Sequence, residues 1–185
     1  MPAPRRATLA LMATSAVAMG AVAFTQLKTH EGLEYKTYLD PVGIPTVCYG
    51  HTGPDVRMGQ TWSAKRCEEI LLSDVLKHRA GLAKCVHTPL TQNQADAVVS
   101  FAFNVGVSRA CSSTLVRKIN ANDLDGAARE FGRWKYARVG GKNVVLRGLV
   151  TRRQHETALF RSTAPAAPLT VTMKYLESGV DNSTS

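Results

Sequence analysis

The chain has 185 residues, of which 44% are hydrophobic and 20% charged, as expected for one globular domain with room for two lobes. Its formal net charge of +9 favours an anionic partner such as nucleic acid, an anionic membrane or an acidic wall polymer. Only 6% of the residues are aromatic, and aromatic and basic residues do not interleave as in single-strand nucleic-acid binders. The composition therefore argues against a nucleic-acid partner.

The N-terminal segment has the pattern of an export signal. Arg5 and Arg6 precede an uncharged run from Ala7 to Leu27. Its apolar part, Ala7 to Phe24, would be about 27 Å long as a helix, barely enough for a hydrocarbon core of about 30 Å. Eleven of these 18 residues are Ala, Gly, Ser or Thr, which gain little from transfer into lipid. The segment would therefore be a weak anchor.

Three interpretations of this segment stay open. It is a cleaved signal peptide, with the small residues Ala21–Ala23 as the cleavage pattern, or an uncleaved anchor that later leaves the membrane. A buried soluble helix is the least favoured. The first two both export the rest of the chain across the inner membrane to the periplasm. We assign residues 1–27 to a signal-anchor segment.

The cysteines agree with export. The chain has four, all beyond this segment: Cys48, Cys67, Cys85 and Cys111. An even number suits an oxidising compartment, and no CxxC pair suggests a zinc site. Three connectivities are possible. We favour Cys48–Cys67 and Cys85–Cys111, which join neighbours in sequence; four reduced buried thiols are the alternative for a cytosolic chain.

Beyond the signal-anchor segment, the sequence pattern changes once, from one typical of β-strands and turns to one typical of helices. Turn-forming and β-branched residues from Gly32 to about Thr61 predict a small β-hairpin lobe, with "PTVCYGHTG" as a strand and turn. From Ser63 onward the apolar residues follow a helical period, and Thr91 and Gln94 form a capping-box pattern. Further helices are predicted at Ser113–Asn120, Leu124–Tyr136 and Leu149–Phe160, and a loop or short turn at "VGGKNVVLRG".

These patterns predict an α+β fold. A small β-hairpin lobe and a larger helical lobe would occupy residues 28–161, preceded by an N-terminal hydrophobic helix. Residues 162–185 are rich in Pro, Ser and Thr and predict a flexible tail.

Glu31, Asp40 and Thr46 are spaced as E-x8-D-x5-T. We expect Glu31 at the end of a first helix, and a hairpin that brings Asp40 beside Thr46, facing Glu31 across a cleft. Glycoside hydrolysis needs one carboxylic acid to protonate the leaving oxygen and a second carboxylate to stabilise the transition state or activate water. A neighbouring hydroxyl can hold that water. Short patterns of this kind also occur by chance.

Several ordered motifs, however, resemble the phage-type lysozymes of glycoside hydrolase family 24, which cut peptidoglycan. That family has a Glu, Asp and Thr triad followed by T-x-x-x-G-H-T-G, matched here by Glu31, Asp40, Thr46 and "TVCYGHTG". The resemblance continues through "TQNQADAVVSFAFNVG", "STLVRKIN" and "FGRWKYARVGGK…GLVTRRQHE", and spans roughly Glu31 to Phe160. It implies a lysozyme-like fold.

The resemblance also implies roles. Glu31 would be the general acid, and Asp40 with Thr46 would position and activate water in an inverting hydrolysis of the β-1,4 bond between N-acetylmuramic acid and N-acetylglucosamine. Candidate substrate-binding residues are Asn104, which matches an F-N-x-G element, His51 and Arg147. No cofactor and no metal are expected.

Other residues near the motifs have plainer interpretations. His51 is expected to form hydrogen bonds within the hairpin rather than transfer protons, His30 to face solvent, and Trp134 to belong to the core. Arg147, Arg152 and Arg153 are all candidates to pair with Glu31, and the sequence does not choose among them.

Some members of this family have an Ala- and Gly-rich anchor that is exported uncleaved and later released, and Ala7–Phe24 resembles it. Glu31 lies only seven residues beyond Phe24, so a tethered chain is predicted to be inactive. The sequence thus predicts a monomeric signal-anchor-release endolysin acting on peptidoglycan. The alternative is a non-catalytic exported wall-binding protein of the same fold.

Overall fold

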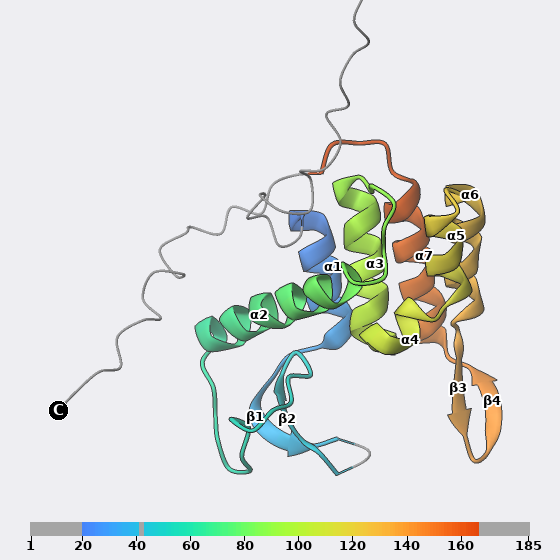
Figure 1. Ribbon diagram of the computed structural model, residues 1–185. Helices are drawn as coiled ribbons and strands as arrows, with labels where there is room; N and C mark the ends of the chain where they lie inside the picture. Colours follow the sequence, from blue (N-terminus) through green and yellow to red (C-terminus); the bar gives the residue numbers. More distant parts are fainter. Residues whose placement is uncertain (1–19, 41–42, 167–185) are drawn as a thin grey trace, which may run out of the picture.

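The computed structural model describes residues 20–40 and 43–166. The predicted N-terminal hydrophobic helix, up to residue 19, and the tail beyond residue 166 lie outside the described residues. Within the described part, Figure 1 shows a helical lobe with two β-hairpins at its lower end. None of the helices in these two ranges has the length and hydrophobicity needed to cross a membrane.

The first lobe follows the sequence-based expectation. Helix α1 (Ala21–Glu31) ends where Gly32 takes a φ of +73°, a left-handed conformation that favours glycine. The chain then forms β1 (Glu34–Leu39), which pairs antiparallel with β2 (Pro45–Cys48). A helix that ends at Glu31 and continues into a hairpin is therefore confirmed.

The larger lobe is helical. It contains α2 (Ala64–Leu82), α3 (Gln92–Val105), α4 (Val107–Cys111), α5 (Thr114–Asn120), α6 (Leu124–Glu130), the short 3-10 helix η1 (Phe131–Arg133) and α7 (Arg147–Arg161). The predicted capping box of Thr91 and Gln94 is present at the start of α3. Helix α3 lies between α1 and α7, and its buried face includes Phe101 (Figure 1). The elements that carry Glu31 and the C-terminal arginines are thus packed on one central helix.

Three features of the C-terminal part differ from the sequence-based prediction. The predicted helix Leu124–Tyr136 ends early, because α6 stops at Glu130 and Tyr136 already belongs to a strand. The predicted loop "VGGKNVVLRG" instead contains much of a second antiparallel hairpin, β3 (Tyr136–Val139) and β4 (Lys142–Val145). Its two-residue turn is Gly140–Gly141, both with positive φ, as such hairpins require. Helix α7 then begins at Arg147, two residues before the predicted Leu149.

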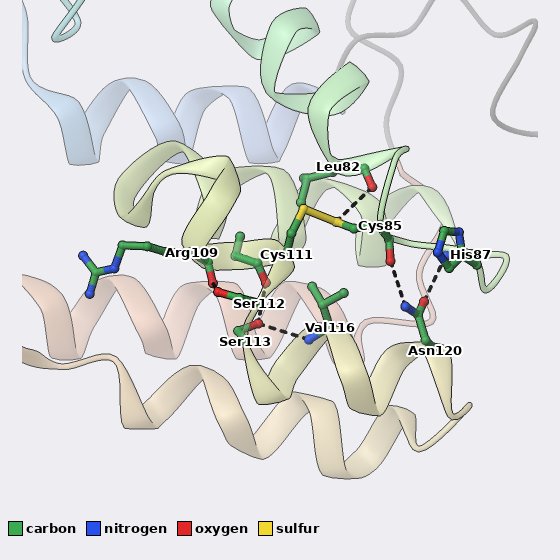
Figure 2. The surroundings of a disulfide bond; sticks show 10 residues. Leu82, Cys85, His87, Arg109, Cys111, Ser112, Ser113, Val116 and Asn120 are labelled. Carbon is green, nitrogen blue, oxygen red and sulfur yellow. Dashed lines mark hydrogen bonds between the residues drawn. A yellow bond between two sulfur atoms is a disulfide. The ribbon is translucent and has the colours of Figure 1, made fainter.

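Both disulfides have the predicted pairing. Cys48–Cys67 joins β2 to α2, and Cys85–Cys111 joins the segment after α2 to the end of α4. Figure 2 shows that Asn120 of α5 also holds this segment, because it donates to the Cys85 carbonyl and accepts from the His87 amide. The described residues include no free cysteine.

Candidate active site

Glu31 lies where the two lobes meet. It is the last residue of α1, and its Oε1 accepts a hydrogen bond from Nη1 of Arg152 on α7, at 2.6 Å. On its other side is the turn after β2, since a Cβ added to Gly50 would lie 3.9 Å from Glu31 Oε2. One oxygen of Glu31 therefore contacts the helical lobe and the other faces the β lobe.

Asp40 and Thr46 lie at the loop end of the first hairpin, where the chain passes from β1 to β2. The Ile44 amide donates to Oδ1 of Asp40 at 2.8 Å, and the Thr46 hydroxyl donates to the Ile44 carbonyl at 2.9 Å. The Asp40 amide also donates to the Ile44 carbonyl, at 3.0 Å. Both side chains are thus held against the backbone of one residue, and Thr46 is buried.

Tyr38 lies on β1, between Glu31 and Asp40 in the sequence. It is directly opposite Thr46 across the strands. Burial, together with the negative charges of Glu34, Asp40 and Glu31, raises the pKa of the Tyr38 hydroxyl. Glu31 and Asp40 therefore both lie near enough to this hydroxyl for their charges to act on it. Sequence reasoning did not single out Tyr38, which lies two residues before Asp40, the first residue after β1.

Arg152 is the arginine that pairs with Glu31. Its Nε donates to Oε1 of Glu156 at 3.2 Å, and its Nη2 donates to the Ser100 carbonyl at 2.9 Å. Arg153 instead donates to Oδ1 of Asn104 at 2.7 Å. Arg147, the first residue of α7, is exposed. Sequence reasoning also missed Glu156, whose spacing from Arg152 and Arg153 in R-R-x-x-E places all three near one helix face.

A groove of about 490 Å³ adjoins Glu31, lined by Thr29, His30, Asn104, Leu146, Gly148, Leu149, Thr151 and Arg152. Of the three candidate substrate-binding residues, Asn104 lines this groove and Arg147 adjoins its lining residues in sequence. His51 does not line it. His51 is buried, and its ring nitrogens pair outside the hairpin, whereas the sequence predicts hydrogen bonds within it. Nδ1 lies 2.6 Å from Asp74 Oδ2 on α2 and Nε2 lies 3.4 Å from Asp55 Oδ1, so the ring joins the β lobe to α2.

His30 is partly buried rather than fully exposed, because it packs against His155 of α7, with Nε2 3.2 Å from His155 Nδ1. Burial lowers the pKa of His30 to about 4, and the positive charges of Arg152, His155 and Arg153 act in the same direction. Trp134 packs edge-on against Phe101 beside the core, in line with its predicted role. No cluster of His, Cys, Asp and Glu suited to a metal ion occurs within residues 20–40 and 43–166.

Comparison with known proteins gives matches over most of the chain. The model of the phage lysozyme family matches residues 28–156. A SAR-endolysin of Bacteriophage PS119 is 38% identical over 158 residues, which cover 84% of this chain and 92% of that protein. The muramidase domain of SpmX from Asticaccaulis excentricus has a TM-score of 0.74 and 34% identity, covering 78% of this chain and 97% of that domain. An endolysin from Escherichia coli O157:H7 phage FAHEc1 has a TM-score of 0.72 and 35% identity. The match covers 80% of this chain and 95% of that endolysin.

Proposed function

Because this chain belongs to the phage lysozyme family, a family of lysozyme-type hydrolases, we propose that it is an endolysin that hydrolyses the β-1,4 bonds between N-acetylmuramic acid and N-acetylglucosamine in peptidoglycan. The observation that carries this proposal is the position of Glu31, between Arg152 of the helical lobe and the hairpin that holds Asp40 and Thr46. A carboxyl group at such a boundary can act on a polymer that lies between the lobes.

In the proposed reaction, Glu31 protonates the glycosidic oxygen. The proton is carried by Oε2, since Oε1 accepts from Arg152. Asp40 accepts a proton from the attacking water, which arrives on the opposite face of the sugar, as in inverting hydrolysis. The Thr46 hydroxyl already donates to the Ile44 carbonyl, so its lone pairs are oriented to accept a hydrogen bond from that water.

Glu31→Gln tests the proposal, because it preserves size and removes the acid. We expect clearing of purified peptidoglycan to fall at least about 100-fold, the usual contribution of a general acid, with little change in Tm. Glu34→Gln is the matched control: it removes an exposed carboxylate three residues away and should keep wild-type activity. A folded Glu31→Gln protein that clears walls at the wild-type rate would reject Glu31 as the acid. Wall binding without any hydrolysis by the wild-type protein would favour the non-catalytic alternative.

The proposed place of action is the bacterial periplasm. Residues 1–27 would tether the chain in the inner membrane before release, or be cleaved as a signal peptide. The name of the relative from Bacteriophage PS119 supports the tether, and two disulfides fit an oxidising compartment. We propose that the released protein acts as a monomer on peptidoglycan, and that its basic charge assists association with the wall.

A further inference from the structure

The proposed reaction gives no role to the buried carboxylate of Glu156. Glu156 of α7 has only 2% of its surface exposed. It lies four residues after Arg152 and three after Arg153, so the three side chains share a face of the helix. A buried carboxylate is costly to desolvate unless its partners compensate, so its contacts are informative.

The two oxygens of Glu156 differ: Oε1 accepts hydrogen bonds, whereas Oε2 forms an ion pair but accepts no hydrogen bond within the described residues. Oε1 accepts from Arg152 Nε at 3.2 Å and from the Ser100 hydroxyl at 3.1 Å. Oε2 lies 3.2 Å from Nη1 of Arg153. Glu156 therefore contacts both buried arginines and, through Ser100, the central helix α3.

These contacts determine the orientation of Arg152. Its Nη1 binds Glu31 at 2.6 Å, its Nε binds Glu156, and its Nη2 binds the Ser100 carbonyl. Because a guanidinium group is planar and rigid, three fixed partners leave it a single orientation. The hydrogen bonds of Arg152 to Glu156 and Ser100 therefore fix the direction of its third hydrogen bond, the one to Glu31.

The negative charge of Glu156 also affects the electrostatic environment of Glu31. A cation beside a carboxylate favours the ionised form, whereas a general acid must hold its proton before it reacts. The charged groups near Glu156 are Arg152 and Arg153 on its own helix and Glu31 on α1, while α3 contributes the neutral Ser100 and Asn104. His155 of α7 meets His30 of α1 at the edge of this cluster. Burial raises the pKa of Glu156, and both arginines oppose that rise.

We propose that Glu156 is a positioning residue for the reaction inferred above: it holds Arg152 against Glu31 and offsets the positive charge of Arg152 and Arg153, so that Glu31 keeps the proton it must donate. This rests on the proposed function, in which Glu31 is the acid. Glu156 acts on substrate only through Arg152 and Glu31.

Glu156→Gln tests this, because it preserves volume and one hydrogen-bonding oxygen but removes the charge. With solubilised peptidoglycan as substrate, we expect kcat to fall about 10-fold or more, as for other residues that orient a catalytic group, with KM within about twofold. The alkaline limb of the pH–rate profile should move to lower pH, because the uncompensated arginines favour ionised Glu31.

Asp96→Asn is the matched control. Asp96 is another buried carboxylate, 1% exposed, which accepts from the Gly20 amide and from Gln92 rather than from the arginines. Its substitution should lower Tm without moving the alkaline limb. If Glu156→Gln has the wild-type pH profile and loses no more kcat than Asp96→Asn, the proposal is overturned.

Two further variants cover the remaining cases. If Glu156→Gln does not fold, Ser100→Ala removes only one hydrogen bond to Glu156, and we expect a lower kcat at constant KM; an unchanged kcat would overturn the proposal. Glu31→Gln is measured in parallel. If it stays active, the proposed acid and this inference both fail, whereas an inactive Glu31→Gln beside a wild-type profile for Glu156→Gln rejects this inference alone.

Discussion

Among single residues, His30 has an environment that links protonation to stability. It immediately precedes Glu31, and burial against α7 lowers its pKa to about 4. In the unfolded chain a histidine titrates near 6.5. Between these values the unfolded state binds more protons than the folded state, so the free energy of unfolding falls as pH is lowered through this window. The contribution of neutral His30 is fully present above about pH 6.5 and is lost below about pH 4.

His30→Gln should therefore flatten the pH dependence of stability. Urea unfolding at several pH values between 4 and 7 would show a smaller loss of unfolding free energy on acidification than in the wild-type protein. His87→Gln is the control, because His87 is exposed and, within the part of the chain that the structure describes, only its backbone amide forms a hydrogen bond. Equal pH dependence in the wild-type and His30→Gln proteins would show that another group controls stability in this window.

The residues also show where sequence-based prediction stops. The sequence was enough to propose Glu31, Asp40 and Thr46 as site residues, because all three lie in one short segment. Local hairpin formation in this segment brings Asp40 and Thr46 together. Arg152 could not be chosen over Arg147 and Arg153, because its partner is 121 positions away. Successive residues of a helix differ by about 100° in direction, so the choice depends on which face of α7 meets α1. That face is set by tertiary packing on α3.

Among the elements, the two hairpins differ in how readily the sequence predicts them. The segment of β1 and β2 has many turn residues, and β2 has a buried Val47 and Cys48. Strand β4, in contrast, is exposed at all four positions, so it lacks the alternation of apolar and polar residues that marks a half-buried strand. Its hairpin depends on a Gly-Gly turn and short-range pairing, and such short strands are easily taken for a loop.

The two disulfides connect different elements, so their removal should have different effects. Each closes a loop of moderate length, with sequence separations of 19 and 26 residues. Loop-closure entropy then predicts a similar loss of about 3 kcal/mol for replacing either pair by serine. Only Cys48–Cys67 ties β2, which carries Thr46, to α2.

We therefore expect the Cys48→Ser/Cys67→Ser protein to lose activity at temperatures where it is still folded. The Cys85→Ser/Cys111→Ser protein is its control, since that disulfide lies among helices and loops outside the site (Figure 2). Melting curves and peptidoglycan clearing at 25 °C measure the two effects separately. Equal activity loss in both proteins would contradict a special role for the β2–α2 link.

In the whole molecule, the end of the apolar N-terminal segment is part of the folded core. Ala23 and Leu27 are 3% and 0% exposed in α1, and the Gly20 amide donates to Asp96 of α3 at 2.7 Å. These residues all belong to the predicted signal-anchor segment, residues 1–27. A residue cannot lie in lipid and in this core at once, so a tethered chain lacks part of the packing that places Glu31.

A tethered chain should therefore be inactive, and release should activate it. We expect the membrane fraction to have much lower specific activity on peptidoglycan than the soluble fraction, and dissipation of the membrane potential to move activity into the soluble fraction. Leu27→Ala should destabilise the released enzyme by about 2–5 kcal/mol through the cavity it leaves, whereas Val22→Ala, at an exposed position of the same helix, should cost little. Equal specific activity in both fractions would reject dormancy. A mature N-terminus near Phe24 would show cleavage instead, and would remove the contacts of Gly20 and Ala23 from the enzyme.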